Sequence, residues 1–425
     1  MTRCRLTFML MALISSSSAL GQINCSNSNK LVCQIPFATG VYNIGGNTSV
    51  PGANQLGQAL NSAIAAQVSQ LPLTSSSGGT AVLFKSGVPI TYDNLGPIMT
   101  DRAQTVGRHN LFLSFSASQF LFTDIDGLDI SKLPFSYLAE SDDKKTNIYT
   151  TEQLNAHFKI DQYIAIATFG VTNKLDVSMI LPIERVSIGA ATSGEQEYLV
   201  TKSTNVGSGP FNVAPTHSPG TANGIADITF NAKYVVKTLE RSTFSAGLNV
   251  RTPTGDDRNY LGSGAWGINP YGVFSYLAKL SPHARFGYEW NSETELNPNL
   301  TRPGSNLALS GGLQYDIGAD YALKKYFTLA GDLMGDQYQN ASKLLLSDPV
   351  PSITYSTAPP NPMNTTVYLP TVVSVNSTYW INDISAGFKW RPYKTLILSG
   401  NALFQLNNVG MRSRPAPLLG VSYQF

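Results

Sequence analysis

The stretch DITFNAKYVVKTLERSTFSAGLNVR, residues 227–251, holds two segments in which apolar and polar side chains alternate, joined by the short connection TLERS. Every second residue is apolar, from Ile228 to Val236 and from Phe244 to Val250. Because successive side chains of a β-strand point to opposite faces, this period predicts two strands, each with one apolar and one polar face. The same alternation recurs in LDVSMILPI (175–183) and TLILSGNALFQLN (395–407).

The composition of the 425 residues disfavours several classes of protein. Charged residues make up 13%, about half of the ~25% in ordinary soluble domains, yet the mean hydropathy is only −0.05. This balance suits neither a cytosolic enzyme nor a helical membrane protein. It suits a membrane barrel, in which a polar inner face dilutes the apolar residues. The formal net charge of +2 gives no support for a nucleic-acid partner.

The connections between strands distinguish a soluble sheet from a membrane barrel. Alternate connections are tight, such as TNK near residue 173 and LKKY near residue 325, and most of the others are long and rich in Ser, Asn, Pro and Gly. Outer-membrane barrels have short periplasmic turns and longer outer loops. We therefore predict an all-β fold, a transmembrane antiparallel up-and-down β-barrel of about 12 strands over residues 105–425. The candidate strands lie near 105–121, 147–170, 174–189, 224–238, 241–252, 265–278, 281–291, 306–322, 325–339, 371–391, 394–407 and 412–425.

The N-terminus predicts export. Residues 1–21 carry two arginines, an apolar run and then small residues, which is the layout of a secretory signal peptide. Together with the barrel, this predicts the outer membrane of a Gram-negative-type bacterium. Cys25 and Cys33 follow closely, and we expect a disulfide between them in an oxidising periplasm, the alternative being two free thiols.

Residues 22–104 precede the barrel as a separate N-terminal segment. Within them NQLGQALNSAIAAQVSQL (54–71) spaces its apolar residues three or four apart, which predicts an amphipathic helix. The segment plugs the lumen or packs in the periplasm, and an amphipathic stripe alone leaves both open. A short hairpin is expected near 80–93, and adding it to the wall gives an alternative count of 14 strands.

The C-terminal stretch LLGVSYQF, residues 418–425, also alternates, and it places Tyr423 and Phe425 on the apolar face. The last strand must pair with the first, because lipid leaves no partner for an open edge. A final strand that ends in Phe resembles the signal read by the barrel-assembly machinery. That resemblance implies that Tyr423 and Phe425 are insertion determinants, whereas the alternative is an interfacial girdle of aromatic residues.

Three central stretches carry a family resemblance: LNVRTPTGDD (248–257), YLGSGAWGINPYGVFSY (260–276) and SPHARFGYEWN (281–291). Together they resemble the outer-membrane barrels called meta-pathway phenol-degradation proteins, distant relatives of the long-chain fatty acid transporters. The resemblance covers roughly residues 95–425. It implies a barrel that takes up hydrophobic or aromatic compounds, and, by analogy with the fatty acid transporters, a lumen plugged by the N-terminal segment.

Alternation also predicts which residues face the lumen. The charged candidates are Asp227, Lys233, Arg251, Asp332, Asp336, Asp383 and Lys389, with Asp176 and Glu184. Charges of both signs in a confined interior are expected to pair and brace the wall, and unpaired ones to set selectivity. At the outer rim we place Gly255, Asp256 and Asp257, either as a solvated turn or as a site for a cation or a lipopolysaccharide phosphate.

Catalysis finds little support in the sequence. A hydrolase needs a nucleophile, a His base and an orienting group, and the four histidines, His109, His157, His217 and His283, belong to no recognisable catalytic motif. We expect no cofactor and no metal. The expected partners are outer-membrane lipid and lipopolysaccharide, the barrel-assembly machinery and a small hydrophobic ligand. The sequence therefore predicts a passive channel or transporter, with a structural or adhesive barrel as the alternative.

Overall fold

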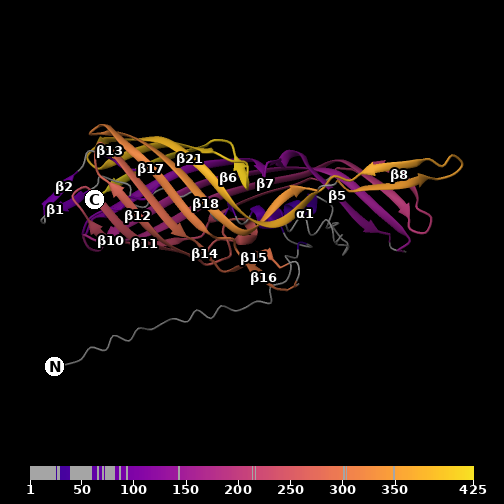
Figure 1. The fold of residues 1–425 in the computed structure, drawn as a ribbon, viewed down its shortest axis with the longest axis horizontal. Helices are drawn as coiled ribbons and strands as arrows, with labels where there is room; N and C mark the ends of the chain where they lie inside the picture. Colours follow the sequence, from indigo (N-terminus) through magenta and orange to yellow (C-terminus); the bar gives the residue numbers. More distant parts are fainter. Residues whose placement is uncertain are drawn as a thin grey trace, which may run out of the picture.

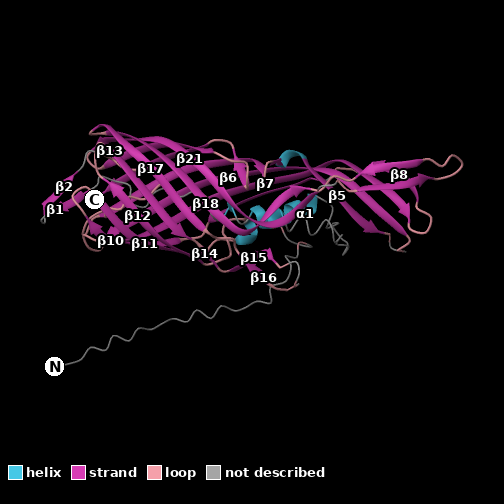
Figure 2. Cartoon of the chain, viewed as in Figure 1, coloured by secondary structure: helices cyan, strands magenta, loops and turns pink. Residues whose placement is uncertain are grey.

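The computed structural model describes residues 25, 29–38, 60–64, 67–68, 71, 82–85, 88–91, 94–141, 144–212, 214–215, 217–299, 302, 304–347 and 350–425. The predicted signal peptide lies outside these residues. Helices are few and short (Figure 2): η1 (Leu31–Cys33), α1 (Gln34–Ala38), η2 (Ile130–Lys132) and η3 (Asp257–Asn259), with further helical residues at 60–64 and 67–68. In the described part of the chain no helix is long and apolar enough to cross a bilayer.

Among the described residues, twelve strands form a closed antiparallel wall. They are β3 (Leu111–Ile125), β6 (Thr146–Gly170), β7 (Leu175–Thr201), β10 (Thr229–Thr238), β11 (Ser242–Arg251), β12 (Gly267–Tyr276), β13 (Leu280–Tyr288), β17 (Leu313–Lys324), β18 (Phe327–Leu346), β21 (Val372–Tyr393), β22 (Leu396–Gln405) and β24 (Ala416–Gln424). Figure 1 shows them running obliquely around the barrel. The last strand pairs with the first, with Tyr423 opposite Leu113. This closure gives the backbone of the terminal strands the partners that lipid cannot supply.

The prediction of about 12 strands is confirmed, and the alternative count of 14 is wrong. The hairpin near 80–93 forms β1 (Val82–Lys85) and β2 (Val88–Thr91), which pair only with each other. Both lie beside the C-terminus at one end of the barrel (Figure 1).

The alternation of short and long connections is also present. One end of the barrel, called here the short-turn end, carries connections such as 171–174 and 325–326, and the other, the long-loop end, carries connections such as 202–228 and 347–371. The short-turn end exposes apolar side chains outward, such as Val177, Met179 and Ile183 on β7 and Phe230 and Tyr234 on β10. An apolar band of this kind is the surface that lipid requires.

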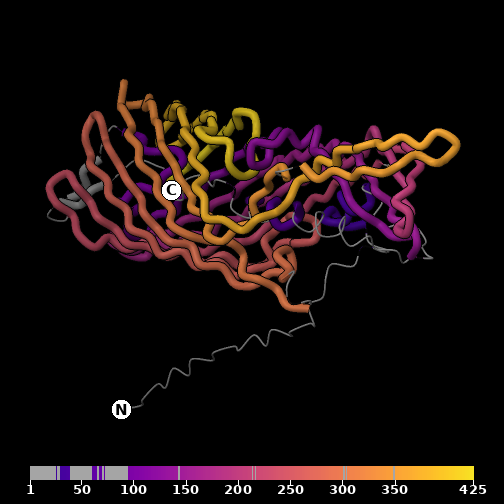
Figure 3. Tube along the Cα trace, turned by 45° about the vertical axis from the view of Figure 1, so that its right-hand side comes forward, coloured from indigo at the N-terminus to yellow at the C-terminus, as the bar shows by residue number. Residues whose placement is uncertain are grey.

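At the long-loop end some strands continue far beyond the wall. β6 and β7 stay paired out to Thr146 and Thr201, and β5 (Leu133–Glu140) pairs with β6. We call residues 133–160 and 186–225, with β19 (Ser352–Thr357) and β20 (Asn364–Tyr368), the outer arm; it forms the extension in Figures 1 and 3. The other short strands near this end are β4 (Leu128–Asp129), β8 (Val206–Asn212), β9 (His217–Ile225), β14 (Trp290–Asn291), β15 (Glu293–Pro298), β16 (Asn306–Ala308) and β23 (Met411–Ser413).

The largest hydrophobic core lies where the outer arm meets the barrel. It joins Phe158 and Val186 of the arm to Tyr260 and Leu296 of the long loops, and it includes Leu31 of the N-terminal segment. The core of this protein therefore fills the long-loop mouth, and the N-terminal segment is part of it.

Candidate functional site: a lumen occupied by the N-terminal segment

Residues 94–106 run through the interior of the barrel. The Asp176 carboxylate accepts from the Val106 N–H at 2.9 Å, the Ser275 hydroxyl accepts from the Ala103 N–H at 2.9 Å, and Asn94 donates to the Ser281 hydroxyl at 3.0 Å. These partners lie on β7, β12 and β13, and further contacts come from β10, β11, β18 and β21. Only a segment inside the barrel can reach the inward faces of so many strands, so residues 94–106 form a lumen segment.

Two of the predicted lumen cations hold this segment by its backbone. Lys233 is 1% exposed and donates to the carbonyl oxygen of Arg102 at 2.6 Å. Lys389 donates to the carbonyl oxygen of Pro97 at 2.5 Å. Charge-assisted hydrogen bonds are stronger than neutral ones, so these two lysines, from β10 and β21, pin the lumen segment on two sides.

Asp332 holds the same segment through a side chain. Its carboxylate accepts from the Thr100 hydroxyl at 2.9 Å and lies 2.6 Å from Nε2 of His283, whose Nδ1 lies 3.0 Å from Asp320. His283, on β13, is therefore buried between two carboxylates. These charged groups of the short-turn half are thus engaged with the lumen segment and with each other.

At the long-loop mouth the N-terminal segment forms a cap. Cys25 and Cys33 are joined by a disulfide with their Cα atoms 5.4 Å apart, and both are buried. Lys30 pairs with Asp256 at 2.6 Å, and the Leu31 N–H donates to the Asn259 side chain at 3.1 Å. The cap is thus tied to the connection between β11 and β12.

The predicted helix over 54–71 is helical at its described residues 60–64 and 67–68. Leu60, Ile64 and Val68 are buried in the mouth core. The polar side of the helix is also engaged, since the Tyr260 hydroxyl donates to Asn61 at 2.6 Å and Asn61 donates to the Val32 carbonyl at 2.8 Å. The described part of residues 22–104 therefore lies at the mouth and in the lumen, apart from β1 and β2.

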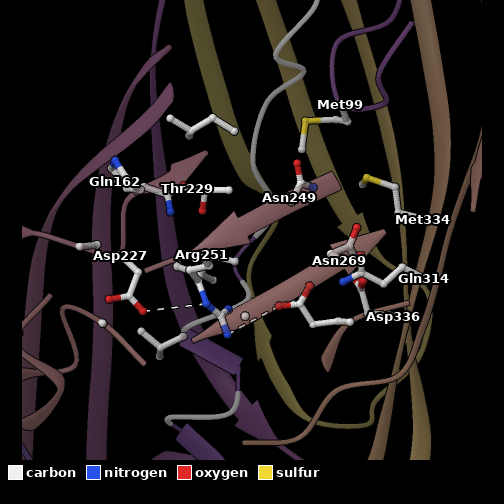
Figure 4. A pocket seen from close by; sticks show the side chains of 18 of the residues that line it. Met99, Gln162, Asp227, Thr229, Asn249, Arg251, Asn269, Gln314, Met334 and Asp336 are labelled. Carbon is white, nitrogen blue, oxygen red and sulfur yellow. Dashed lines mark hydrogen bonds and ion pairs between the residues drawn. The ribbon is translucent and has the colours of Figure 1, made fainter. Parts of the chain in front are cut away.

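A cavity of about 210 Å³ remains in the long-loop half of the lumen. Four of the predicted lumen residues line it, namely Asp227, Arg251, Asp336 and Asp383, together with Glu184. The apolar part of the lining comes from the N-terminal segment, the lumen segment, a long loop and β18, namely Val68, Leu71, Met99, Leu261 and Met334. Figure 4 shows Met99 and Met334 beside the amides of Asn249 and Asn269. The site combines carboxylates with an apolar wall.

Most of the charges at the cavity are paired. Arg251 lies 3.9 Å from Asp227 and 3.6 Å from Glu289, and a dashed line in Figure 4 joins it to Asp227. Arg285 pairs with Asp316 at 3.1 Å. Pairing of this kind is what charges removed from bulk water require, and it braces the wall between neighbouring strands.

The motif TPTGDD is held in place by Asp227. One carboxylate oxygen of Asp227 accepts from the Gly255 N–H at 3.0 Å, and the other accepts from the Ser263 N–H at 2.7 Å. A Cβ at Gly255 would collide with the Leu261 carbonyl, so only glycine fits there. The motif is thus part of a folded connection between β11 and β12 at the mouth, residues 252–266, which we call the mouth ledge. At its tip burial raises the pKa of Asp257 above its usual value, and nearby Glu295 adds to that rise.

The remaining sequence candidates lie apart from the cavity. Tyr423 and Phe425 stack edge to face with ring centres 4.7 Å apart at the short-turn end, and Phe425 is 66% exposed. His109, His157 and His217 are exposed. Within the described residues, no group of three or more His, Cys, Asp or Glu side chains is placed to hold a metal ion.

Several residues of the site were missed from the sequence. Three further charged residues line the cavity: Arg285 on β13, Glu289 directly after it and Asp316 on β17. The period of two in SPHARFGYEWN would have found Arg285 and Glu289. Arg412, which pairs with Asp383 at 3.0 Å, lies in the predicted strand 412–425 on the face opposite Tyr423 and Phe425, so the period of two would have found it as well. Asp101 of the lumen segment comes from an irregular stretch, where no sequence period marks an inward position.

The fold and the lumen define a closed membrane-type β-barrel with an internally threaded N-terminal segment. The family model described as a putative MetA-pathway of phenol degradation matches residues 141–343 of this chain. The resemblance drawn from the central motifs is therefore confirmed over that stretch, which is shorter than the 95–425 expected. No curated protein sequence matches the chain significantly.

Three solved structures share part of the fold. The COG4313 outer membrane channel from Pseudomonas putida F1 is 10% identical, with 76% of this chain and 98% of that chain covered and a TM-score of 0.44. A Pseudomonas aeruginosa FadL homologue is 9% identical (75% and 90% covered, TM-score 0.29). The Pseudomonas putida toluene transporter TodX is 10% identical (74% and 88% covered, TM-score 0.24). These scores are low, and we base the function on the geometry of this chain.

Proposed function

We propose that this protein is an outer-membrane channel for the passive uptake of small hydrophobic or aromatic compounds. Its short-turn end lies in the periplasm and its outer arm outside the cell, in keeping with the apolar band and the lengths of the connections. No part of the mechanism requires energy coupling. A compound binds at the long-loop mouth and passes through the cavity. It enters the periplasm when the lumen segment moves aside.

One observation carries the proposal. A single apolar core runs from Phe158 and Ile188 on the inner face of the outer arm to Met99, Leu261 and Met334 in the cavity wall. Burial of apolar surface is favourable at about 25 cal/mol per Å², so a hydrophobic compound finds similar surroundings along this route. The described N-terminal residues at the mouth, with the lumen segment, act as the plug of this route, because the lumen segment crosses the interior below the cavity.

The test is uptake into liposomes that hold the refolded mature chain, with a labelled aromatic hydrocarbon and a labelled long-chain fatty acid. We expect uptake above that of empty vesicles, with folding verified by heat-modifiable gel migration. If a folded barrel takes up neither compound, a structural or adhesive role of the outer arm replaces the channel.

A further inference from the structure

The cavity carries more acidic than basic side chains. The basic groups at its lining are Arg251 and Arg285, and both already face carboxylates of the wall. Asp383 has its partner in Arg412 at 3.0 Å. Two lining carboxylates, Asp336 and Glu184, form no salt bridge among the described residues. The guanidinium of Arg285, whose charge acts on Asp336, is already paired with Asp316.

Asp336 points into the cavity from β18, where Figure 4 shows it near Gln314. Among the described residues its carboxylate makes no hydrogen bond and no ion pair. Its inward neighbour on the same strand is Met334, two residues away, and Met334 also lines the cavity. One wall of the cavity therefore offers an unpaired carboxylate directly beside an apolar thioether side chain.

Glu184 lies on β7, six strands around the twelve-stranded wall and so on the opposite side. It is only 5% exposed. One of its oxygens accepts from the Gln162 amide at 2.9 Å, and the other has no hydrogen-bond partner among the described residues. A carboxylate so deeply buried normally has a cation beside it. Glu184 therefore adds to the same space a second carboxylate that forms no salt bridge.

We propose that the cavity binds a small organic cation, a protonated amine on an apolar body such as an aromatic ring. The ammonium group donates to Asp336, and the apolar body packs on Met334, Met99 and Leu261. The cavity of about 210 Å³ is larger than an apolar cavity of about 150 Å³ that binds benzene, so it has room for one aromatic ring with a short amine. This inference rests on the proposed channel and names one preferred class among its hydrophobic substrates, those that carry a positive charge.

The test compares three probes of equal size, benzylammonium, benzyl alcohol and benzoate, binding to the refolded full mature chain in detergent by titration calorimetry. We expect benzylammonium to bind roughly tenfold or more tightly than the other two, since a hydrogen bond to a charged group is the larger contribution. Asp336→Asn removes most of that preference and Glu184→Gln part of it. The matched control is Glu140→Gln, which removes a carboxylate from the outer arm, far from the cavity.

Equal binding of benzylammonium and benzyl alcohol, or an unchanged preference in folded Asp336→Asn and Glu184→Gln, would overturn the inference. The outcome is separable from that of the proposed function. Uptake of a neutral aromatic hydrocarbon without any preference for the amine would support the proposed channel and contradict the cation site. A preference for the amine without uptake of any compound would support the cation site and contradict the proposed channel.

Discussion

Asp161 of β6 and Arg185 of β7 lie directly opposite each other across the two strands, at the level where the outer surface of the barrel changes character. Toward the short turn the exposed residues are apolar, such as Tyr163 and Val177. Toward the outer arm they are polar, and the inward faces become apolar, as at Phe158. We infer that these two opposed charged residues mark the outer edge of the membrane, since charged side chains are stable in water and costly in lipid.

An arginine introduced on the outer surface is expected to lower the free energy of unfolding more on the short-turn side of this level than on the outer-arm side. Met179→Arg places a cation on the lipid face of β7 and should lower the free energy of unfolding in liposomes by about 2–4 kcal/mol. Ser193→Arg, on the same face of the same strand but above Arg185, should change it by less than about 1 kcal/mol. Denaturant titration followed by tryptophan fluorescence measures both. Equal losses would place the membrane edge elsewhere.

Asp227 is expected to hold the mouth ledge at 252–266. Asp227→Ala leaves the Gly255 and Ser263 N–H groups without their acceptor, at about 1–3 kcal/mol for each unsatisfied buried donor. Hydrogen exchange of these two amides should accelerate, and limited proteolysis should cut the ledge sooner. Glu293→Ala removes an exposed carboxylate nearby and serves as the control. Unchanged exchange in Asp227→Ala would show that the ledge is held by other contacts.

Loss of one lysine should loosen the lumen segment. Lys233→Met keeps the length of the side chain but removes its hydrogen bond to the Arg102 carbonyl. A charge-assisted bond contributes about 1.5–3 kcal/mol. The state in which the lumen segment has left its position should therefore become roughly tenfold or more populated. Conductance in planar bilayers should rise accordingly. Lys237→Met, on the exposed end of the same strand, should behave as the natural protein, and similar currents from both variants would argue against the plug.

The outer arm should be less stable at alkaline than at acidic pH. Burial, and then the charge of nearby Glu195, raises the pKa of Glu152 to about 9, whereas an unfolded Glu titrates near 4.3. The folded arm therefore holds a proton that the unfolded chain releases, so stability falls as pH rises from about 4.3 toward about 9. Glu152→Gln should flatten this dependence, as measured by hydrogen exchange of β5 and β6 at pH 5 and pH 8. The same slope in the variant would assign it to other groups.

Phe425 is proposed to act in membrane insertion. Phe425→Ala should reduce the fraction of heat-modifiable, folded barrel in outer membranes of expressing cells several-fold. The control is Phe404→Ala, which removes another exposed aromatic side chain of the barrel, on β22. If both variants insert equally poorly, the two rings act alike as interfacial aromatics, and no special role remains for the C-terminal one.

Much of the wall could be predicted from the sequence because a strand between lipid and lumen has two different faces. The alternation in 227–251 and 395–407 located β10, β11 and β22 within a few residues. The lengths of the connections predicted which ends of the strands lie at the short-turn end and which at the long-loop end. The inward candidates from Asp227 to Lys389 follow from the same period, since it depends only on local backbone geometry.

The tertiary structure alone decided what those inward residues do. Lys233 and Lys389 bind the backbone of the lumen segment, and Asp227 binds a ledge whose amides lie 28 and 36 residues further along the chain. Such contacts join residues of high sequence separation, and no local period encodes them. That Asp336 and Glu184 form no salt bridge is likewise a property of the assembled lumen. The salt bridges in the lumen join residues of different strands and connections, so only the complete barrel determines which carboxylates have a basic partner.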